Sequence, residues 1–285
     1  MIGFAMPGFE HLLPKHVSRG TFQINRFPNN ELAIELDECV NKNHALIVGS
    51  IAPADEDLLV FTLLADTLRR CGATRIIALL PYLGYARQDE AKPNESLGMA
   101  WAGRLARASG VYEIITVDLH SPQAAKACPV PIRSLSPATL FAKAVGKQDF
   151  TVVAPDEGAT DRAGDIAKEL GAAPPVVLPK QRMESDVQHL GLPVPADKTA
   201  LVVDDVLDTG STLVSACQHL KSQGVKDIVI AVTHGLFTGT KWQKLWKLGV
   251  SRLFVSDSLP LPVSLQKDEK VKICKLQSLL TQVFH

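Results

Sequence analysis

The residues best suited to chemistry stand between positions 202 and 212, in the segment VVDDVLDTGST. An apolar run delivers two acids to the carboxyl end of an expected strand, where ligands bind in open α/β sheets. The loop that follows offers hydroxyl and backbone N–H groups at the start of an expected helix, an arrangement that binds a phosphate monoester. The acids can accept hydrogen bonds from sugar hydroxyls or hold a divalent cation. We therefore predict a site for a phosphorylated, polyhydroxylated ligand, formed by Asp204, Asp205, Asp208, Thr209, Gly210, Ser211 and Thr212.

The alternative interpretation of this loop is an aspartate-rich turn in which Thr209 or Ser211 caps the helix. Capping requires one polar side chain, whereas the loop carries several, so the ligand site is favoured. The loop by itself does not decide which reaction uses the ligand.

Two further segments carry side chains suited to phosphates. In PYLGYARQDE, Arg87 offers a planar fork for a phosphate or for stacking, and Gln88 can both donate and accept hydrogen bonds. In VVLPKQRME, Lys180 and Arg182 follow an expected strand, and two cations on a loop suit the neutralisation of phosphate charge. The alternative for both segments is a solvated surface turn without function.

The framework that must position these residues is an α/β fold. Short, continuous, apolar runs alternate with helix-length amphipathic runs, which is typical of βαβ units and a mostly parallel sheet covered by helices on both faces. The expected strands are ALIVGS (45–50), RIIALL (75–80), EIITVD (113–118), TVVAP (151–155), ALVVDD (200–205), DIVIAVT (227–233) and RLFVS (252–256).

An internal repeat indicates two similar domains. ALIVGS, a loop, a helical run and IIALLPYLGY recur half a chain later as ALVVDD, a loop, a helical run and IVIAVTHGLF. We predict domains over 1–140 and 141–274, with the Pro- and Ser-rich stretch 128–139 as the crossover and a last helix over 275–285 packing on the first domain. The alternative is that all βαβ units look alike.

Composition restricts the classes of function. Thirty basic and thirty acidic residues cancel, so no global field attracts nucleic acid or anionic lipid. The five cysteines are an odd number without a CxxC pair, which indicates neither a disulfide framework nor a zinc site. No apolar run approaches the ~18 residues of a membrane span. We expect a cytoplasmic protein with no membrane or nucleic-acid partner.

The loop at 202–212 resembles the ribose-phosphate-binding loop of the type I phosphoribosyltransferase superfamily. PYLGYARQDE, VDLHSPQ, VVAPDEGATDRA, VVLPKQRME and FVSDSL resemble segments of the ribose-phosphate diphosphokinases, also called phosphoribosyl diphosphate synthetases. The resemblance covers most of the chain at several independent points. It implies two domains of the type I phosphoribosyltransferase-like fold.

This resemblance implies an ATP site in the first domain. Arg87 and Gln88 are expected to contact ATP, and RFPNNEL aligns with the family's adenine-binding segment FxDGE, where asparagine stands in place of both Asp and Gly. An asparagine amide can still hydrogen-bond a base, and asparagine tolerates positive φ. The expected ATP-binding residues are therefore Phe27, Asn29, Asn30, Glu31, Arg87 and Gln88.

The resemblance also implies magnesium and a pair of catalytic cations. His120 and Asp156 are expected to bind Mg²⁺, which takes few protein ligands and relies on nucleotide phosphates and water. A lone histidine is more often structural, and the partner Asp156 is what favours the metal. Lys180 and Arg182 are expected to stabilise the developing charge, with Arg182 also assisting ribose 5-phosphate at Asp204, Asp205, Asp208, Thr209, Gly210, Ser211 and Thr212.

The implied reaction is transfer of the β,γ-diphosphoryl group of ATP to the C1 hydroxyl of ribose 5-phosphate, with release of AMP. The family's adenine segment comes from a neighbouring subunit, which implies a homo-oligomer. One alternative is a phosphoribosyltransferase, which explains the loop at 202–212 but not YARQD, DLH or the repeat. The other is a non-catalytic, synthetase-associated subunit, against which the retained Lys180, Arg182, Asp208 and His120 argue.

Overall fold

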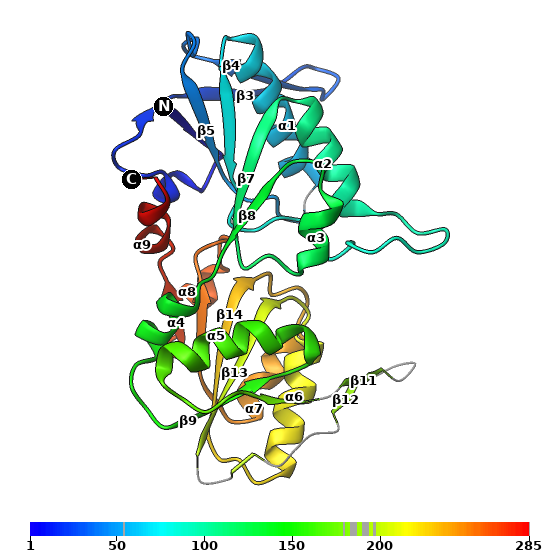
Figure 1. The fold of residues 1–285 in the computed structure, drawn as a ribbon, viewed down its shortest axis with the longest axis vertical. Helices are drawn as coiled ribbons and strands as arrows, with labels where there is room; N and C mark the ends of the chain where they lie inside the picture. Colours follow the sequence, from blue (N-terminus) through cyan, green and yellow to red (C-terminus); the bar gives the residue numbers. More distant parts are fainter. Residues whose placement is uncertain (54, 179, 183–186, 190–193, 196–197, 285) are drawn as a thin grey trace. The chain divides into compact units, whose positions relative to one another are not determined.

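The chain folds into two compact units, which a computed structural model describes separately (Figure 1). The first comprises residues 1–135 and 277–285, and the second residues 136–276. The structure describes the chain except residues 54, 179, 183–186, 190–193, 196–197 and 285; the side chains of 180–182 and 187–189 are likewise not described. The predicted boundary at 140/141 falls inside helix α4, Ala138–Val145. The C-terminal segment expected to pack on the first domain belongs to the first unit and contacts η1 (Glu10–Leu12).

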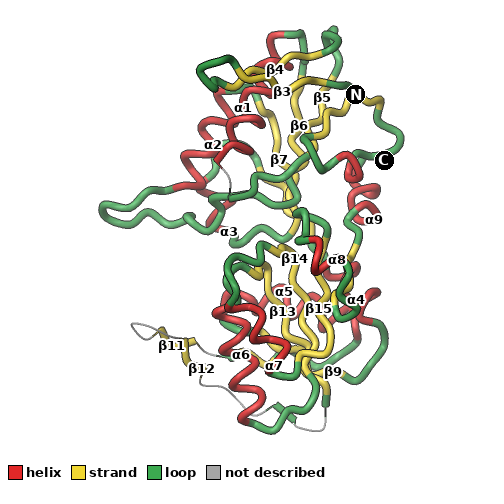
Figure 2. The backbone as a smooth tube through the Cα atoms, turned by 180° about the vertical axis from the view of Figure 1, so that it is seen from behind, coloured by secondary structure: helices red, strands yellow, loops and turns green. Residues whose placement is uncertain are grey.

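The first unit is built on a parallel sheet of six described strands, in the order β2-β1-β5-β6-β7-β8. Helices α1 and α2 lie next to each other beside this sheet in both views (Figures 1 and 2). Besides η1, its elements are β1 (Ile2–Ala5), β2 (Ser18–Arg19), β3 (Phe22–Arg26), β4 (Leu32–Leu36), β5 (His44–Val48), α1 (Asp55–Arg70), β6 (Arg75–Leu79), α2 (Gly98–Ala108), β7 (Val111–Val117), α3 (Pro122–Ala127), β8 (Ile132–Leu135), α9 (Gln277–Leu280) and η4 (Thr281–Val283).

The second unit repeats this plan, with described strands in the order β10-β9-β13-β14-β15-β16, all paired in parallel. Besides α4, its elements are β9 (Phe150–Ala154), η2 (Glu157–Ala159), α5 (Thr160–Leu170), β10 (Val176–Val177), β11 (Lys180–Arg182), β12 (Val187–His189), β13 (Thr199–Leu207), α6 (Ser211–Ser222), β14 (Ile228–Gly235), η3 (Lys241–Gln243), α7 (Lys244–Lys247), β15 (Val250–Ser256), α8 (Val263–Gln266) and β16 (Val271–Cys274).

The strand orders confirm the predicted fold class of two similar α/β domains. Each strand of one sheet has a counterpart at the same place in the other, with β5 matching β13 and β6 matching β14. These are the two pairs of strands that the internal repeat identified as equivalent. All seven expected apolar runs lie in strands, because a parallel strand buried on both faces needs a continuous apolar sequence.

The second unit shows why these strands are apolar on both faces. Ala200 and Val202 of β13 pack with α6 and α7, whereas Leu201 and Val203 pack with α4 and α5. The sheet is thus covered by helices on both sides, and successive β13 side chains enter opposite cores. At the carboxyl end of β13 this alternation directs Asp205 toward the α5 side, where the site is built.

Two antiparallel hairpins were not predicted from the sequence. β3 pairs with β4 from Phe22↔Leu36 to Arg26↔Leu32, and β11 pairs with β12. The first hairpin is half-buried or exposed along both strands, so it lacks the continuous apolar run that identified the sheet strands. Its turn holds the expected adenine-binding residues.

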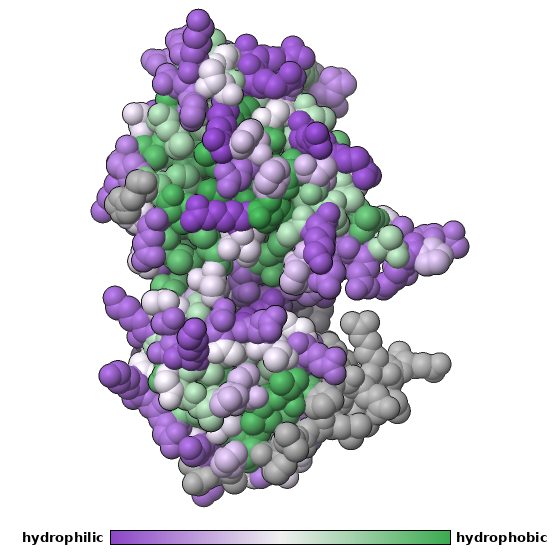
Figure 3. All heavy atoms as spheres, in the orientation of Figure 1, coloured by the Kyte–Doolittle hydropathy of each residue, from purple (hydrophilic) through white to green (hydrophobic). Residues whose placement is uncertain are grey.

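Hydrophilic and hydrophobic residues are mixed on the visible surface (Figure 3). Figure 3 shows hydrophilic residues over much of the visible face of each unit, with hydrophobic residues between them. Within the described residues, no helix is long and apolar enough to cross a membrane.

Candidate functional site

The predicted phosphate loop is the turn between β13 and α6, and it has the local geometry of an anion site. Gly210 is the N-cap of α6 in a left-handed conformation (φ 84°), and its carbonyl accepts the Val214 N–H at 2.8 Å. The hydroxyls of Thr209 and Ser211 lie 3.2 Å apart at the helix start. Since residues 211–214 include no acid, the positive end of α6 is not offset by a carboxylate.

The corresponding loop of the first unit has the opposite electrostatics. α1 carries Asp55, Glu56 and Asp57 in its first turn, and Asp57 already accepts the Ala52 N–H at 3.2 Å. Burial raises the pKa of Asp57, while the Ala52 hydrogen bond lowers it and Glu56 raises it. A phosphate is therefore disfavoured at the start of α1, in contrast to the acid-free start of α6.

Trp242 of η3 packs against the phosphate loop at Gly210. A Cβ atom at Gly210 would lie 2.7 Å from the Trp242 Cα, so only glycine fits this position. The indole is buried and contacts the Phe237 ring edge-on, with 5.1 Å between the ring centroids. Its N–H donates to the Gly239 carbonyl at 3.0 Å. Sequence reasoning missed this support, because η3 follows the loop by some thirty residues.

The two acids at the end of β13 are buried against an arginine. Asp204 and Asp205 are 8% and 5% exposed, and Arg162 of α5 places its Nη1 3.9 Å from Asp204 Oδ1 and 3.5 Å from Asp205 Oδ1. The Asp205 N–H also donates to Asp204 Oδ1 at 3.0 Å. The closer approach to Asp205 agrees with its place on the α5 side of the sheet.

Burial raises the pKa of Asp204 well above its ordinary value. The negative charge of Asp205 acts in the same direction, Arg162 acts against both, and Asp156 raises the pKa further. Asp156 therefore lies close enough to Asp204 for the two carboxylates to repel each other. The carboxyl oxygens gathered here can accept hydrogen bonds from sugar hydroxyls or hold a divalent cation.

Arg162 is the site residue that sequence reasoning failed to select. It stands in the segment VVAPDEGATDRA, which was singled out for Asp156 alone. The sequence signal that could have identified Arg162 is its closeness to Asp156. Arg162 stands in the first turn of α5, directly after the short helix η2 that Asp156 caps. An arginine so close to a strand end can reach the acids of the neighbouring strand.

The expected magnesium ligands lie in separate units. Asp156 follows β9 in the second unit, and His120 follows β7 in the first; both are half-buried. Across the described residues, no three His, Cys, Asp or Glu side chains gather closely enough to hold a metal ion. The carboxylate donors near Asp204 fit a hard cation that takes its remaining ligands from phosphates and water. The side chains of Lys180 and Arg182 lie outside the described part of the structure, and only their place in β11 is established.

The expected adenine segment is the turn of the β3–β4 hairpin. Phe27 is 58% exposed at its start, and the Phe27 N–H donates to the Glu31 carbonyl at 2.9 Å. Asn30 takes the left-handed conformation (φ 70°) expected for an asparagine in a glycine position. The Asn29 Oδ1 accepts the Glu31 N–H at 3.2 Å, so the side chain of Asn29 closes the turn.

The other expected ATP residues lie in the loop after β6. Arg87 and Gln88 are exposed, and Gln88 Oε1 accepts from the Ser96 hydroxyl at 2.8 Å. A Cβ atom at Gly98 would lie 2.7 Å from Gln88 Oε1, so the start of α2 fits closely around this side chain. Gln88 is thereby held in place by the loop and α2.

Side-chain contacts gather the loops of the first unit around the start of α1. Arg26, at the end of β3, pairs with Glu56 at 2.6 Å, and Tyr85 donates its hydroxyl proton to Asp55. Asp89 accepts from Ser121, the residue after His120. The structure therefore brings the hairpin turn, the Arg87–Gln88 loop and the His120 loop to one end of the first unit.

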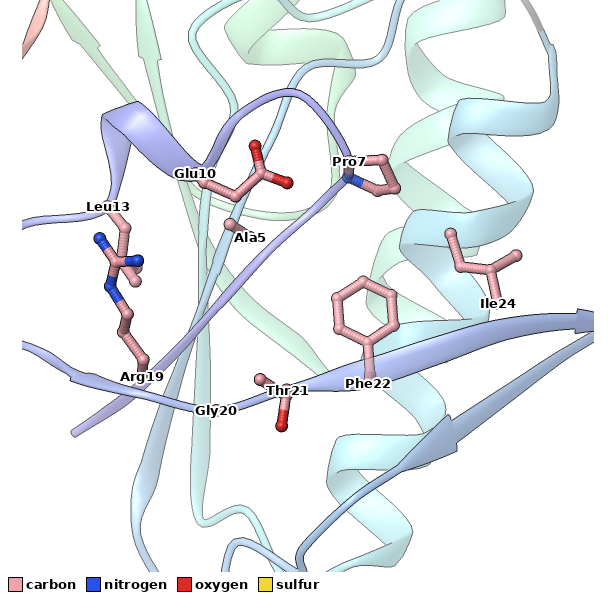
Figure 4. A pocket seen from close by; sticks show the side chains of 9 residues that line it. All are labelled: Ala5, Pro7, Glu10, Leu13, Arg19, Gly20, Thr21, Phe22 and Ile24. Carbon is pink, nitrogen blue, oxygen red and sulfur yellow. The ribbon is translucent and has the colours of Figure 1, made fainter.

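The first unit also contains a cavity of about 360 Å³ beside β3 (Figure 4). Its walls are mostly apolar, with Glu10 and Arg19 as charged members, and none of the sequence-predicted site residues lines it. The lining residues are Ala5, Pro7, Glu10, Leu13, Arg19, Gly20, Thr21, Phe22 and Ile24.

Comparison with known proteins places this geometry in a family. Residues 10–110 match the family described as the N-terminal domain of ribose phosphate pyrophosphokinase, and residues 135–254 match the phosphoribosyl transferase domain family. The chain is 30% identical over 271 residues to a ribose-phosphate pyrophosphokinase of Campylobacter jejuni, covering 92% of this chain and 87% of that protein. The chain belongs to the ribose-phosphate pyrophosphokinase family.

Other relatives agree with this ribose-phosphate pyrophosphokinase assignment. A ribose-phosphate pyrophosphokinase of Haemophilus ducreyi is 31% identical over 278 residues, which cover 94% of this chain and 87% of that protein. The crystal structure of phosphoribosylpyrophosphate synthetase from Mycobacterium smegmatis matches with a TM-score of 0.88 and 27% identity, covering 99% of this chain and 96% of that one. The resemblance inferred from the sequence is confirmed. These relatives show that the protein is an enzyme of the ribose-phosphate pyrophosphokinase type.

Proposed function

We propose that the protein transfers the β,γ-diphosphoryl group of ATP to the C1 hydroxyl of ribose 5-phosphate, with Mg²⁺ as cofactor and AMP as the second product. The proposal rests chiefly on one observation. The first turn of α6 carries no acid, and the strand that leads into it ends with two buried acids, Asp204 and Asp205, which pair with Arg162. A phosphate loop next to carboxylates suits an acceptor that carries both a phosphate and sugar hydroxyls.

The second unit is proposed to bind the acceptor. Residues 208–212 would receive the 5-phosphate through backbone N–H and hydroxyl groups, and Asp204 and Asp205 would accept hydrogen bonds from ribose hydroxyls. Arg162 supports this role because it compensates the buried charge of both acids. Arg182 is proposed to assist the binding of ribose 5-phosphate.

The first unit is proposed to bind ATP. Support comes from the grouping of the hairpin turn 27–31, Arg87, Gln88 and the His120 loop around the start of α1. The exposed Phe27 ring suits stacking on an adenine, and the Arg87 fork suits a phosphate. Asp156 with His120 would hold Mg²⁺, which when bound shields the negative charge of the phosphates.

The chain's own contribution to the transfer is positioning and charge neutralisation. The C1 hydroxyl attacks the β-phosphorus of ATP in line, the bond to the α-phosphate oxygen breaks, and AMP leaves. Lys180 and Arg182 are proposed to stabilise the charge that grows on the transferring oxygens. Asp204 or Asp205 can polarise the attacking hydroxyl, and no general base is assigned.

Two further proposals concern the assembly of the protein and its location. The protein is proposed to be a homo-oligomer with its ATP site near a subunit interface, which light scattering on the purified protein will test. It is also proposed to act in the cytoplasm, where ATP and ribose 5-phosphate are available.

An AMP-release assay on the purified protein tests the proposed reaction. With ATP, ribose 5-phosphate and Mg²⁺, AMP and 5-phosphoribosyl 1-diphosphate are expected in equal amounts, and omission of either substrate should abolish both. With chelator in place of Mg²⁺, no AMP should form, and added Mg²⁺ should restore it. Diphosphate release from 5-phosphoribosyl 1-diphosphate with a free base would instead indicate a phosphoribosyltransferase. No turnover of either kind would indicate a non-catalytic subunit.

Replacing Gly210 with alanine is expected to raise the KM for ribose 5-phosphate about tenfold and to lower Tm by several degrees. The added Cβ would meet the Trp242 Cα at 2.7 Å, so the phosphate loop must move away from η3. Steady-state kinetics and thermal unfolding measure the two effects.

The matched control is Gly171→Ala. Gly171, the C-cap of α5, also has positive φ (66°), but an added Cβ has no atom within 4 Å, so the control carries the backbone strain without the collision. Equal effects of the two substitutions on KM would contradict the role of Trp242 in shaping the loop.

A further inference from the structure

Two cysteines of the first unit that are about thirty residues apart in the sequence are neighbours in the structure. Cys39 follows β4 and is exposed, whereas Cys71 directly follows α1 and is half-buried. The Cys39 side chain lies close enough to Cys71 to raise the pKa of the Cys71 thiol. The Val40 N–H also donates to the Cys71 carbonyl at 3.1 Å, so the two main chains run side by side here.

The backbone around Cys39 is anchored on both sides of the cysteine. Before it, the Asp37 N–H donates to the Thr21 carbonyl at 3.2 Å, and the Asp37 carboxylate accepts from the side chains of Thr21 and Gln23. After it, the Lys42 N–H donates to the Gly72 carbonyl at 3.0 Å. Because both flanks are fixed, the Cys39 thiol is held against Cys71 at a high effective concentration.

The other three cysteines differ from this pair. Cys128, Cys217 and Cys274 are buried. Burial raises the pKa of Cys217 and of Cys274 to about 12, which keeps both as inert thiols. Cys39 is exposed whereas Cys71 is half-buried, so we assign Cys39 as the attacking thiolate; the neighbouring Cys39 also raises the pKa of Cys71.

We propose that Cys39 and Cys71 are a redox modification site, which closes as a reversible intramolecular disulfide when the protein meets a low-molecular-weight disulfide such as oxidised glutathione. The Cys39 thiolate attacks one sulfur of that disulfide, forming a mixed disulfide and releasing one glutathione thiolate. The Cys71 thiolate then attacks the Cys39 sulfur and releases the second glutathione. The two protons of the cysteines end on the two glutathione thiols, and the cysteines are oxidised as glutathione disulfide is reduced.

The disulfide would tie the base of the β3–β4 hairpin to the C-terminal end of α1. The hairpin is already joined to the start of α1 by the Arg26–Glu56 pair, so oxidation would attach it to this helix at both ends. Closing a loop of about thirty residues restricts the unfolded chain and stabilises the folded protein. A rise in Tm on the order of 5 °C is expected.

The test uses the full-length protein, incubated with oxidised glutathione under native conditions. Thiol titration is expected to show the loss of two thiols, and peptide mass mapping without reductant is expected to show one linked pair containing Cys39 and Cys71. Thermal unfolding should show the higher Tm, and dithiothreitol should reverse all three changes.

Matched variants separate this disulfide from general oxidation. Cys39→Ser and Cys71→Ser should each abolish the linked peptide and the rise in Tm, whereas Cys128→Ser in the same unit should retain both. A wild-type protein that keeps all its thiols, that carries separate glutathione adducts on the two cysteines, or that forms a disulfide between two molecules on a non-reducing gel would overturn the proposal.

Discussion

Replacing Lys180 with alanine is expected to lower kcat about a thousandfold while leaving the Kd for ribose 5-phosphate within a few-fold of the original value. Removal of one group that stabilises transition-state charge costs about 10²–10³ in kcat, and diphosphoryl transfer depends almost entirely on positioning and charge neutralisation. Because Lys180 is proposed to act on the transferring phosphates, binding of the acceptor should survive its loss. AMP release measures kcat, and calorimetric titration with ribose 5-phosphate measures Kd.

Lys198→Ala is the matched control for Lys180. Lys198 lies in the same unit and pairs with the exposed Asp149 at 3.0 Å, and such a surface pair contributes little to stability or binding. The control should therefore keep kcat within about twofold. A Lys180→Ala protein with near-normal kcat, or one that loses ribose 5-phosphate binding in proportion to kcat, would remove Lys180 from the catalytic role.

Replacing Arg162 with methionine is expected to lower kcat/KM for ribose 5-phosphate about a hundredfold and to destabilise the protein. Methionine keeps much of the volume but leaves Asp204 and Asp205 buried without their cation, and breaking one side of a buried ion pair typically costs about 3–5 kcal/mol. Lys168→Met is the control on the same helix, because Lys168 is exposed and lies in the last turn of α5. Kinetics and thermal unfolding of both variants measure the difference.

The pH dependence of stability gives a second readout for Arg162. Since burial raises the folded-state pKa of Asp204 above its ordinary value, this carboxyl favours the folded protein most at low pH, and that contribution is lost as pH rises through the folded-state pKa. Arg162 opposes the shift, so its removal should raise the pKa of Asp204 further. The Tm deficit of Arg162→Met should therefore grow as the pH rises above the folded-state pKa that Asp204 has in the unchanged protein. A deficit that does not change with pH would show that Arg162 does not compensate Asp204.

The two halves of the proposed site differ in how far the sequence could predict them. The turn 208–212 was predictable because an apolar strand, two acids and a small hydroxyl loop are consecutive in the chain, and their local geometry follows from that order. The hairpin β3–β4 was not predictable in the same way, since its half-exposed strands lack a continuous apolar run. The role of Asn30 in its turn nevertheless followed from the tolerance of asparagine for positive φ.

The sequence by itself determined the α/β class, the repeat and the phosphate loop, because each depends on residues that are neighbours along the chain. Only the tertiary structure decided that Arg162 faces Asp204 and Asp205, that Trp242 lies against Gly210, and that Cys39 meets Cys71. These contacts join residues that are far apart in sequence and on different elements. They depend on how strands and helices pack, which periodicity and turn chemistry do not specify.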